Sequence, residues 1–134
     1  MARRRHARRL AVDVLYQADV VGRDPLAVLE ERRTVGERIP AFTEDLVRGV
    51  AGHLRELDRL IGEHAEGWTV QRMAAVDRAL LRLACFEILY RDDISVAVAA
   101  SEAVAAAREL STEDSGRFVN GILGKIARER AGTG

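Results

Sequence analysis

The architecture of this 134-residue chain follows from one segment, Met73-Ala-Ala-Val-Asp-Arg-Ala-Leu-Leu-Arg-Leu-Ala-Cys-Phe-Glu-Ile-Leu-Tyr90. Its residues are apolar or alanine apart from four, Asp77, Arg78, Arg82 and Glu87. A helix that is apolar on nearly every side is stable only when its neighbours enclose it. The segment therefore predicts a central buried helix, with Thr69 as its N-cap, around which the rest of the chain packs.

The flanking sequence favours helices on both sides of this segment. Only two prolines occur, and good helix formers such as Ala, Leu, Arg and Glu are abundant. Periodicity and capping signals predict helices from the arginine-rich start to Gly22, from Pro25 to about Val35, two between Pro40 and Ile61 with a break at Gly49 to Gly52, from Ser95 to about Leu110, and from Ser111 to about Arg130. We see no linker and no repeat, so we expect residues 1–134 to form a single all-α domain.

Composition and motifs argue against several classes of function. Acidic and basic residues number 21 each, and the single cysteine, Cys85, lies in an apolar run. There is no His or Cys spacing typical of metal ligands, no glycine-rich phosphate loop and no nucleophile elbow. No segment approaches the ~20 apolar residues that a membrane helix needs. We therefore expect a cytoplasmic protein that is not an enzyme, needs no cofactor or metal and has no membrane partner.

The basic residues gather at the start of the chain. Residues 1–9 hold five arginines and no acid, while the rest of the chain has 16 basic and 21 acidic residues, a net charge of −5. A cationic arm on a mildly acidic body is typical of a protein that meets a polyanion such as RNA. The candidate phosphate-binding residues are Arg3, Arg4, Arg5, Arg8 and Arg9. The alternative is a basic terminus that binds polyanions weakly and without specificity.

Tyr16 is the aromatic candidate beside this arm. If the arm is helical, Arg5, Arg9 and Tyr16 fall near one face, because steps of four residues advance by only about 40°. An aromatic ring in that place could stack an unpaired base. The alternative is that Tyr16 covers the edge of the core.

Three charged residues form a window on the predicted central helix. Asp77, Arg78 and Arg82 fall within a sector of about 140° at 100° per residue. Arg78 and Arg82 repel each other mildly at this spacing unless an acid lies between them. Either a protein partner or an internal salt bridge, for example to Glu109 or Asp114, would supply that acid, and the sequence leaves both interpretations open.

The start of the last helix carries a further candidate. Ser111 and Asp114 are spaced as a capping box, with aspartate in place of the usual glutamate. This spacing predicts that Asp114 has a structural role. Contact with a protein partner is the alternative.

Taken together, the motifs resemble those of the NusB family of bacterial transcription antitermination factors. The resemblance covers nearly the whole chain, and its last block is the most distinctive. The blocks are Arg8-Arg-Leu-Ala-Val-Asp-Val-Leu-Tyr16, Val76-Asp-Arg-Ala-Leu-Leu-Arg82-Leu-Ala, and Glu113-Asp-Ser-x-Arg-Phe118-Val-Asn-Gly-Ile-Leu123.

The resemblance implies a fold of about seven helices in two packed three-helix bundles. It also implies that the protein binds the boxA element of nascent RNA together with the ribosomal protein NusE. Such a complex helps RNA polymerase to pass terminators, notably in ribosomal RNA operons. By position, Arg4, Arg5 and Arg8 match the family's RNA-binding arm. Further positions at the RNA and partner surface are matched by Tyr16, Asp77, Arg82, Asp114 and Phe118.

From the arm and the resemblance we predict two sets of site residues. The predicted RNA-binding set consists of Arg3, Arg4, Arg5, Arg8, Arg9, Tyr16 and Phe118. The predicted partner-binding set consists of Asp77, Arg78, Arg82 and Asp114. The same helical domain precedes a catalytic domain in some ribosomal RNA cytosine methyltransferases, and we expect the free-standing factor here. A protein-only scaffold and an accessory subunit of an RNA-modifying enzyme are the alternatives, and the sequence does not distinguish a monomer from a homodimer.

Overall fold

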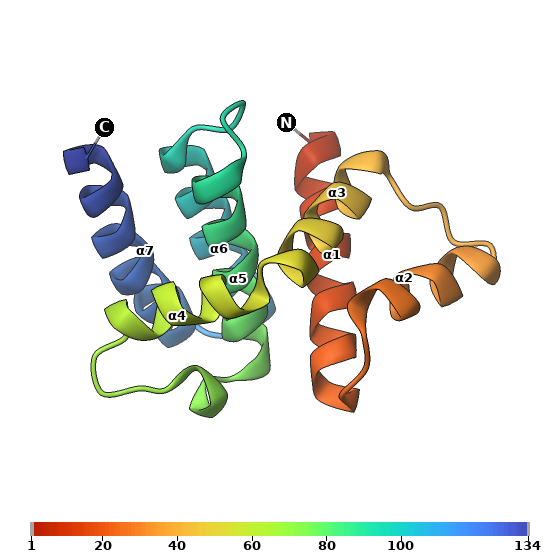
Figure 1. Ribbon diagram of the computed structural model, residues 1–134, viewed down its shortest axis with the longest axis horizontal. Helices are drawn as coiled ribbons and strands as arrows, with labels where there is room; N and C mark the ends of the chain where they lie inside the picture. Colours follow the sequence, from red (N-terminus) through yellow and green to blue (C-terminus); the bar gives the residue numbers. More distant parts are fainter. Residues whose placement is uncertain (1, 134) are drawn as a thin grey trace.

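The computed structural model describes residues 2–133, and these residues form seven α-helices and a short 3-10 helix without a strand (Figure 1). Met1 of the predicted arm and Gly134 of the predicted domain lie outside the described residues. The predicted all-α fold of seven helices is confirmed. The elements are α1 (Ala2–Val21), α2 (Pro25–Thr34), α3 (Ala41–Gly52), α4 (Leu54–His64), η1 (Val70–Arg72), α5 (Ala75–Tyr90), α6 (Val96–Leu110) and α7 (Glu113–Thr133).

The helices gather into two groups, and α5 of the second group packs against the first. Helices α1, α2 and α3 pack on one another and form the first group, on the right of Figure 1. Helices α5, α6 and α7 form the second, and α4 lies across α5 and α7, so the second group has four helices in all. Because α5 also packs on α1 and α3, it joins the two groups into one core.

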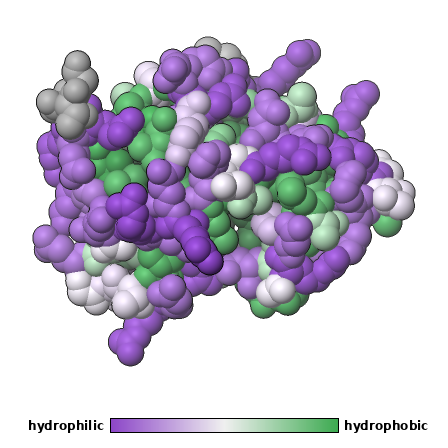
Figure 2. Space-filling view, viewed as in Figure 1, coloured by the Kyte–Doolittle hydropathy of each residue, from purple (hydrophilic) through white to green (hydrophobic). Residues whose placement is uncertain are grey.

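The central helix is buried as its composition predicts. Leu81 and Cys85 have no accessible surface, and every residue from Ala79 to Ile88 except Arg82 is buried. Burial raises the pKa of the Cys85 thiol to about 12, so this cysteine stays protonated at neutral pH and is a core residue. Hydrophilic side chains cover most of the face shown in Figure 2, with apolar patches between them.

Local signals set several helix ends as predicted. The Asp24 carboxylate accepts a hydrogen bond from the Leu26 backbone N–H at 3.0 Å, and the Ser95 hydroxyl accepts one from Val98 at 3.1 Å. Gly49 allows a close approach, because a Cβ atom there would lie 2.0 Å from Cζ of Phe86. This glycine therefore sets how closely α3 packs against α5.

The predicted N-cap of the central helix was wrong. Thr69 precedes η1 without capping it through its side chain, and α5 begins only at Ala75, after an extended turn. A side chain of α5 holds that turn, because Nη1 of Arg78 donates hydrogen bonds to the backbone carbonyls of Val70 at 3.1 Å and Met73 at 3.0 Å, eight and five residues earlier in the chain. Spacing between Thr69 and Met73 does not reveal this contact, because it depends on where the Arg78 side chain points.

None of the helices in residues 2–133 combines the length and the apolar character that a membrane crossing requires.

Candidate nucleic-acid interface

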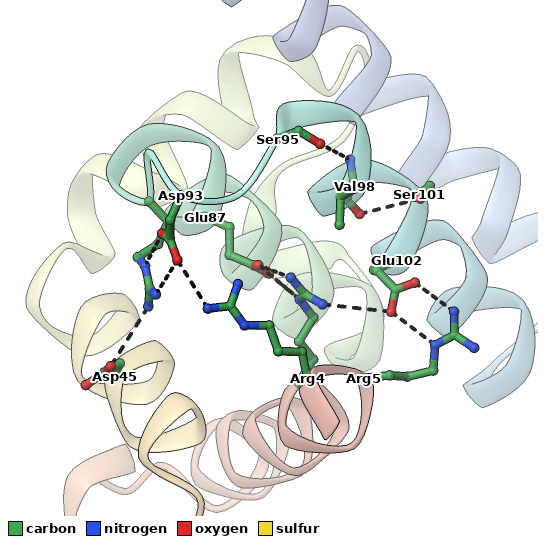
Figure 3. Close-up of polar contacts among 11 residues, drawn as sticks. Arg4, Arg5, Asp45, Glu87, Asp93, Ser95, Val98, Ser101 and Glu102 are labelled. Carbon is green, nitrogen blue, oxygen red and sulfur yellow. Dashed lines mark hydrogen bonds and ion pairs between the residues drawn. The ribbon is translucent and has the colours of Figure 1, made fainter. Parts of the chain in front are cut away.

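The arginine-rich start of the chain is the first part of α1, and its exposed arginines face acids of the second helix group. Arg4 contacts Asp93 in the turn after α5, with 3.2 Å between Nη2 and Oδ2. Helix α6 supplies the other two acids, because Arg5 pairs with Glu102 at 2.9 Å and Arg9 pairs with Glu109 at 2.7 Å. Arg3 is exposed. The described part of the predicted arm, residues 2–9, is therefore helical, and its accessible arginines face acids of α6 and of the turn before it (Figure 3).

Arg8 differs from its neighbours because it is buried. Only 7% of this residue is accessible, and its guanidinium donates to the Glu87 carboxylate from Nε at 3.0 Å and from Nη2 at 2.8 Å. Glu87 on α5 is itself 1% accessible. The pair connects α1 to the central helix, so Arg8 has a structural role, and its predicted contact with RNA stays a prediction. The sequence analysis did not identify Glu87 as its partner.

A single aromatic ring organises the cations at this end of the molecule. The guanidinium carbon of Arg4 lies 4.5 Å from the centroid of the Phe42 ring, with Arg91 at 5.1 Å and Arg8 at 5.3 Å. Cations placed over a ring face are attracted by its quadrupole. Acids around the ring neutralise the three cations, and Figure 3 shows them as Asp45, Glu87, Asp93 and Glu102.

Tyr16 lies beside an open groove of about 570 Å³ between α1 and the end of α6. The residue is 38% accessible, and Leu110 on the opposite side of the groove is also exposed. Arg9 lines the same groove. An accessible ring next to a cation is suited to stacking on a base while the cation meets its phosphate.

Asp77 lies at a second groove, beyond the start of α5. This carboxylate is 6% accessible, and its Oδ1 atom has no hydrogen-bond partner. Burial raises the pKa of the Asp77 carboxyl above its ordinary value, and the Ser115 side chain acts in the opposite direction. Asp114 and Phe118 line the same groove.

The two grooves lie next to each other at the start of α5 and the end of α6. Val76 lines the first and Asp77 the second, and likewise Leu110 at the end of α6 lines the first and Thr112 before α7 lines the second. The structure therefore brings the Tyr16 and Arg9 groove next to the groove of Asp77, Asp114 and Phe118. That surface carries members of both predicted site sets.

Trp68 is a member of this surface that the sequence analysis did not single out as a site residue. It is 51% accessible, lines the second groove, and meets Phe118 edge to face with 5.8 Å between ring centroids. Its type was the available signal, because tryptophan is enriched at binding surfaces, where one end of the side chain is apolar and the other is polar.

Arg78 and Arg82 form internal salt bridges. Nη2 of Arg78 lies 2.6 Å from Asp19, and Arg82 pairs with Asp58 at 2.7 Å. Asp19 also lies 3.9 Å from Arg82, so it is the acid between the two guanidinium groups. The suggested acids were wrong, because Glu109 pairs with Arg9 and Asp114 with Arg117. Partner binding by Arg78 and Arg82 stays a prediction.

The predicted capping box at the start of α7 was also wrong. The cap is Thr112, whose hydroxyl accepts a hydrogen bond from the Ser115 backbone N–H at 3.0 Å. Asp114 is exposed and forms an ion pair with Arg117 one turn further along the helix. The helix begins one residue later than the Ser111 cap requires, which leaves the Asp114 carboxylate accessible at the edge of the second groove.

The fold and this surface define a class of protein, an all-helical binding protein that presents cations and aromatic rings side by side. Within residues 2–133 no three His, Cys, Asp or Glu side chains are grouped so as to hold a metal ion. The model of the NusB family matches residues 5–128, and the chain belongs to the NusB family. It is a transcription antitermination factor and not an enzyme, as the sequence analysis predicted.

Relatives and solved structures agree with this assignment. The transcription antitermination protein NusB of Salinispora arenicola is 51% identical over 131 residues, which cover 95% of this chain and 96% of that protein. NusB of T. maritima superposes with a TM-score of 0.82 at 37% identity, covering 94% and 91% of the two chains. A chain in a crystal structure of the antitermination factors NusB and NusE with double-stranded RNA superposes with a TM-score of 0.83 at 27% identity, covering 96% and 98%.

Proposed function

We propose that this protein binds the boxA element of nascent RNA together with the ribosomal protein NusE. In the cytoplasm the complex joins the antitermination machinery of RNA polymerase and supports transcription of ribosomal RNA operons. The observation that carries the proposal is the pair of neighbouring grooves, one lined by Arg9 and Tyr16 and the other by Asp77 and Phe118. The likeness to a chain crystallised with NusE and RNA supports it.

The surface offers strong electrostatics but few base contacts. Arginines attract phosphates regardless of sequence, and the attraction weakens as salt rises because bound counterions are released. Sequence selectivity requires contacts to bases, and in the described surface the accessible rings beside the two grooves are His6, Tyr16, Trp68 and Phe118. We therefore expect weak RNA binding by the protein alone. Binding becomes tighter and more selective once NusE extends the surface.

The test is a binding titration with a short boxA-like RNA and a scrambled control, each with and without NusE, at two salt concentrations. The proposal predicts selective binding that tightens with NusE. Equal, salt-sensitive binding to both RNAs that ignores NusE would contradict it. Binding of NusE without any binding of RNA would favour the protein-only scaffold, and a methyltransferase that co-purifies would favour the accessory subunit.

Arg5→Ala tests the arm, because the Arg5 side chain is 62% accessible and lies outside the core. Loss of one phosphate contact should weaken RNA binding and reduce the slope of log affinity against log salt by about 0.7 for a single strand. The matched control is Arg23→Ala. Arg23 is also exposed and ion-paired, to Glu31, but it lies beyond the far end of α1, on the order of 25 Å away by the helix rise. An equal effect of both variants would contradict a specific role of the arm.

A further inference from the structure

We propose that Asp93, Glu102 and Glu109 compete with RNA phosphates for the arginines of α1, so that RNA binding is an exchange of carboxylate for phosphate. The inference rests on the proposed function, because it concerns the same arginines. These three acids are defined here as the masking acids. They make the arm less attractive to polyanions in general than its charge suggests.

The geometry of the Arg5 pair shows why the two ligands compete. The guanidinium donates to Glu102 from Nε at 3.2 Å and from Nη2 at 2.9 Å, a two-pronged contact with both carboxylate oxygens. Phosphate is bound by arginine through the same planar fork. A phosphate that takes this same edge of the guanidinium must therefore displace Glu102, whose contact with Arg5 is drawn in Figure 3.

Two of the masking acids lie on α6, opposite two arginines of α1. Glu102 and Glu109 are seven residues apart, two turns of α6, and face Arg5 and Arg9, which are one turn apart on α1. The hydrogen bond from Arg5 lowers the pKa of the Glu102 carboxyl, and the hydrogen bond from Arg9 does the same for Glu109. Both carboxylates are therefore charged at neutral pH, when RNA would bind.

Burial separates the arginines that can exchange from the one that cannot. Each of the ion pairs of Arg4, Arg5 and Arg9 has at least one accessible side chain, so phosphate can replace their carboxylates. The pair of Arg8 and Glu87 is buried, and leaving Glu87 without its partner is costly, so this pair stays intact. After the exchange the displaced acids lie near phosphates, and their repulsion lowers the affinity for every RNA.

The masking acids therefore leave the choice of RNA to contacts other than phosphate. A polyanion that offers only phosphates makes no other contact to offset the cost of displacing the masking acids. A cognate RNA also contacts the rings beside the two grooves and the partner protein. These additional contacts offset the cost, so the arm contributes affinity without retaining unrelated RNA.

The experiment compares Glu102→Gln with wild type in RNA titrations at two salt concentrations, using the boxA-like RNA and the scrambled control. Removing this one competing carboxylate, which is 19% accessible, should tighten binding to both RNAs by about two- to fivefold and steepen the salt dependence. The matched control is Glu31→Gln, which removes the same charge beside Arg23, away from the arm. This control should leave RNA affinity close to that of wild type.

Unchanged binding by Glu102→Gln would overturn the inference, because it would mean that Glu102 does not compete with phosphate. Weaker binding would also overturn it, because it would mean that the acid orients Arg5 for RNA. If Glu102→Gln lowers the unfolding temperature, Glu109→Gln serves in its place, since the Glu109 side chain is 68% accessible. Arg5→Ala distinguishes a failure of the masking inference from a failure of the proposed function. Loss of binding in Arg5→Ala without a gain in Glu102→Gln refutes the masking alone, whereas no effect of Arg5→Ala refutes the role of the arm in the proposed function.

Discussion

Replacing Arg8 by alanine should destabilise the whole protein, although the sequence places this residue among exposed arginines. The substitution removes three hydrogen bonds, at 2.8, 3.0 and 3.1 Å, from a Glu87 carboxylate that is 1% accessible. Breaking a buried ion pair by removing one partner costs about 3–5 kcal/mol. For a chain of this length, 1 kcal/mol corresponds to a shift in Tm of about 3–5 °C. The expected fall in Tm is therefore about 10–20 °C.

Thermal and urea unfolding followed by circular dichroism measure this effect. Two variants serve as comparisons. Arg5→Ala should change Tm little, because the Arg5 side chain of this ion pair is 62% accessible. The double variant Arg8→Met/Glu87→Leu should recover most of the lost stability, because apolar side chains of similar size replace a buried pair without leaving a charge unpaired.

A loss of less than about 1 kcal/mol in Arg8→Ala would refute the reasoning, since that is the size expected of an exposed pair. It would mean that Glu87 finds water or another cation once Arg8 is gone. The prediction also limits how RNA-binding data are interpreted. If Arg8→Ala binds RNA poorly, its Tm decides whether a phosphate contact or the fold was lost, and deletion of residues 1–9 has the same ambiguity.

Three further predictions follow from single contacts. Asp77→Asn should raise Tm at neutral pH, because burial raises the pKa of the Asp77 carboxyl; the gain should disappear below pH 3.8, where the acid becomes protonated in both the folded and the unfolded state. His64 has a raised pKa because the Leu60 carbonyl and then Glu129 hold its charged form, so its stabilisation is present below about pH 6.5 and is lost as pH rises through the raised value; the Tm difference from His64→Gln should shrink accordingly as pH rises above about 6.5. Thr112→Ala should cost about 1 kcal/mol in urea unfolding, whereas an equal cost in Ser111→Ala would restore the predicted cap.

Much of the fold could be predicted because its signals are local. The apolar segment from Met73 to Tyr90 predicts a buried helix from side-chain composition, and the structure buries it at the junction of the two helix groups. Asp24 and Ser95 cap helices within two and three residues of themselves. Such interactions depend only on neighbours in the chain, so they are legible in the order of residues.

The candidate site was predictable in part, for the same reason. The clustering of arginines at residues 3–9 marked the start of α1, and family motifs pointed to Tyr16 and Phe118. The partners of the charged residues were not predictable. Arg78 and Arg82 face Asp19 and Asp58 in place of the acids that spacing suggested, because those partners lie 59 and 24 residues away in the chain.

Arg5 and Arg8 show most clearly what composition and spacing reveal and what packing adds. Both belong to one run of like residues, three positions apart, and nothing local distinguishes their chemistry. The packing of α1 against α5 and its position beside α6 turn one toward a buried Glu87, 79 residues away, and leave the other at the surface beside Glu102, 97 residues away. Charge and helical character are properties of residues and their neighbours, so the chain itself carries them. Whether a charge is buried, paired or accessible depends on which distant segments meet it, and that is settled only when the helices pack.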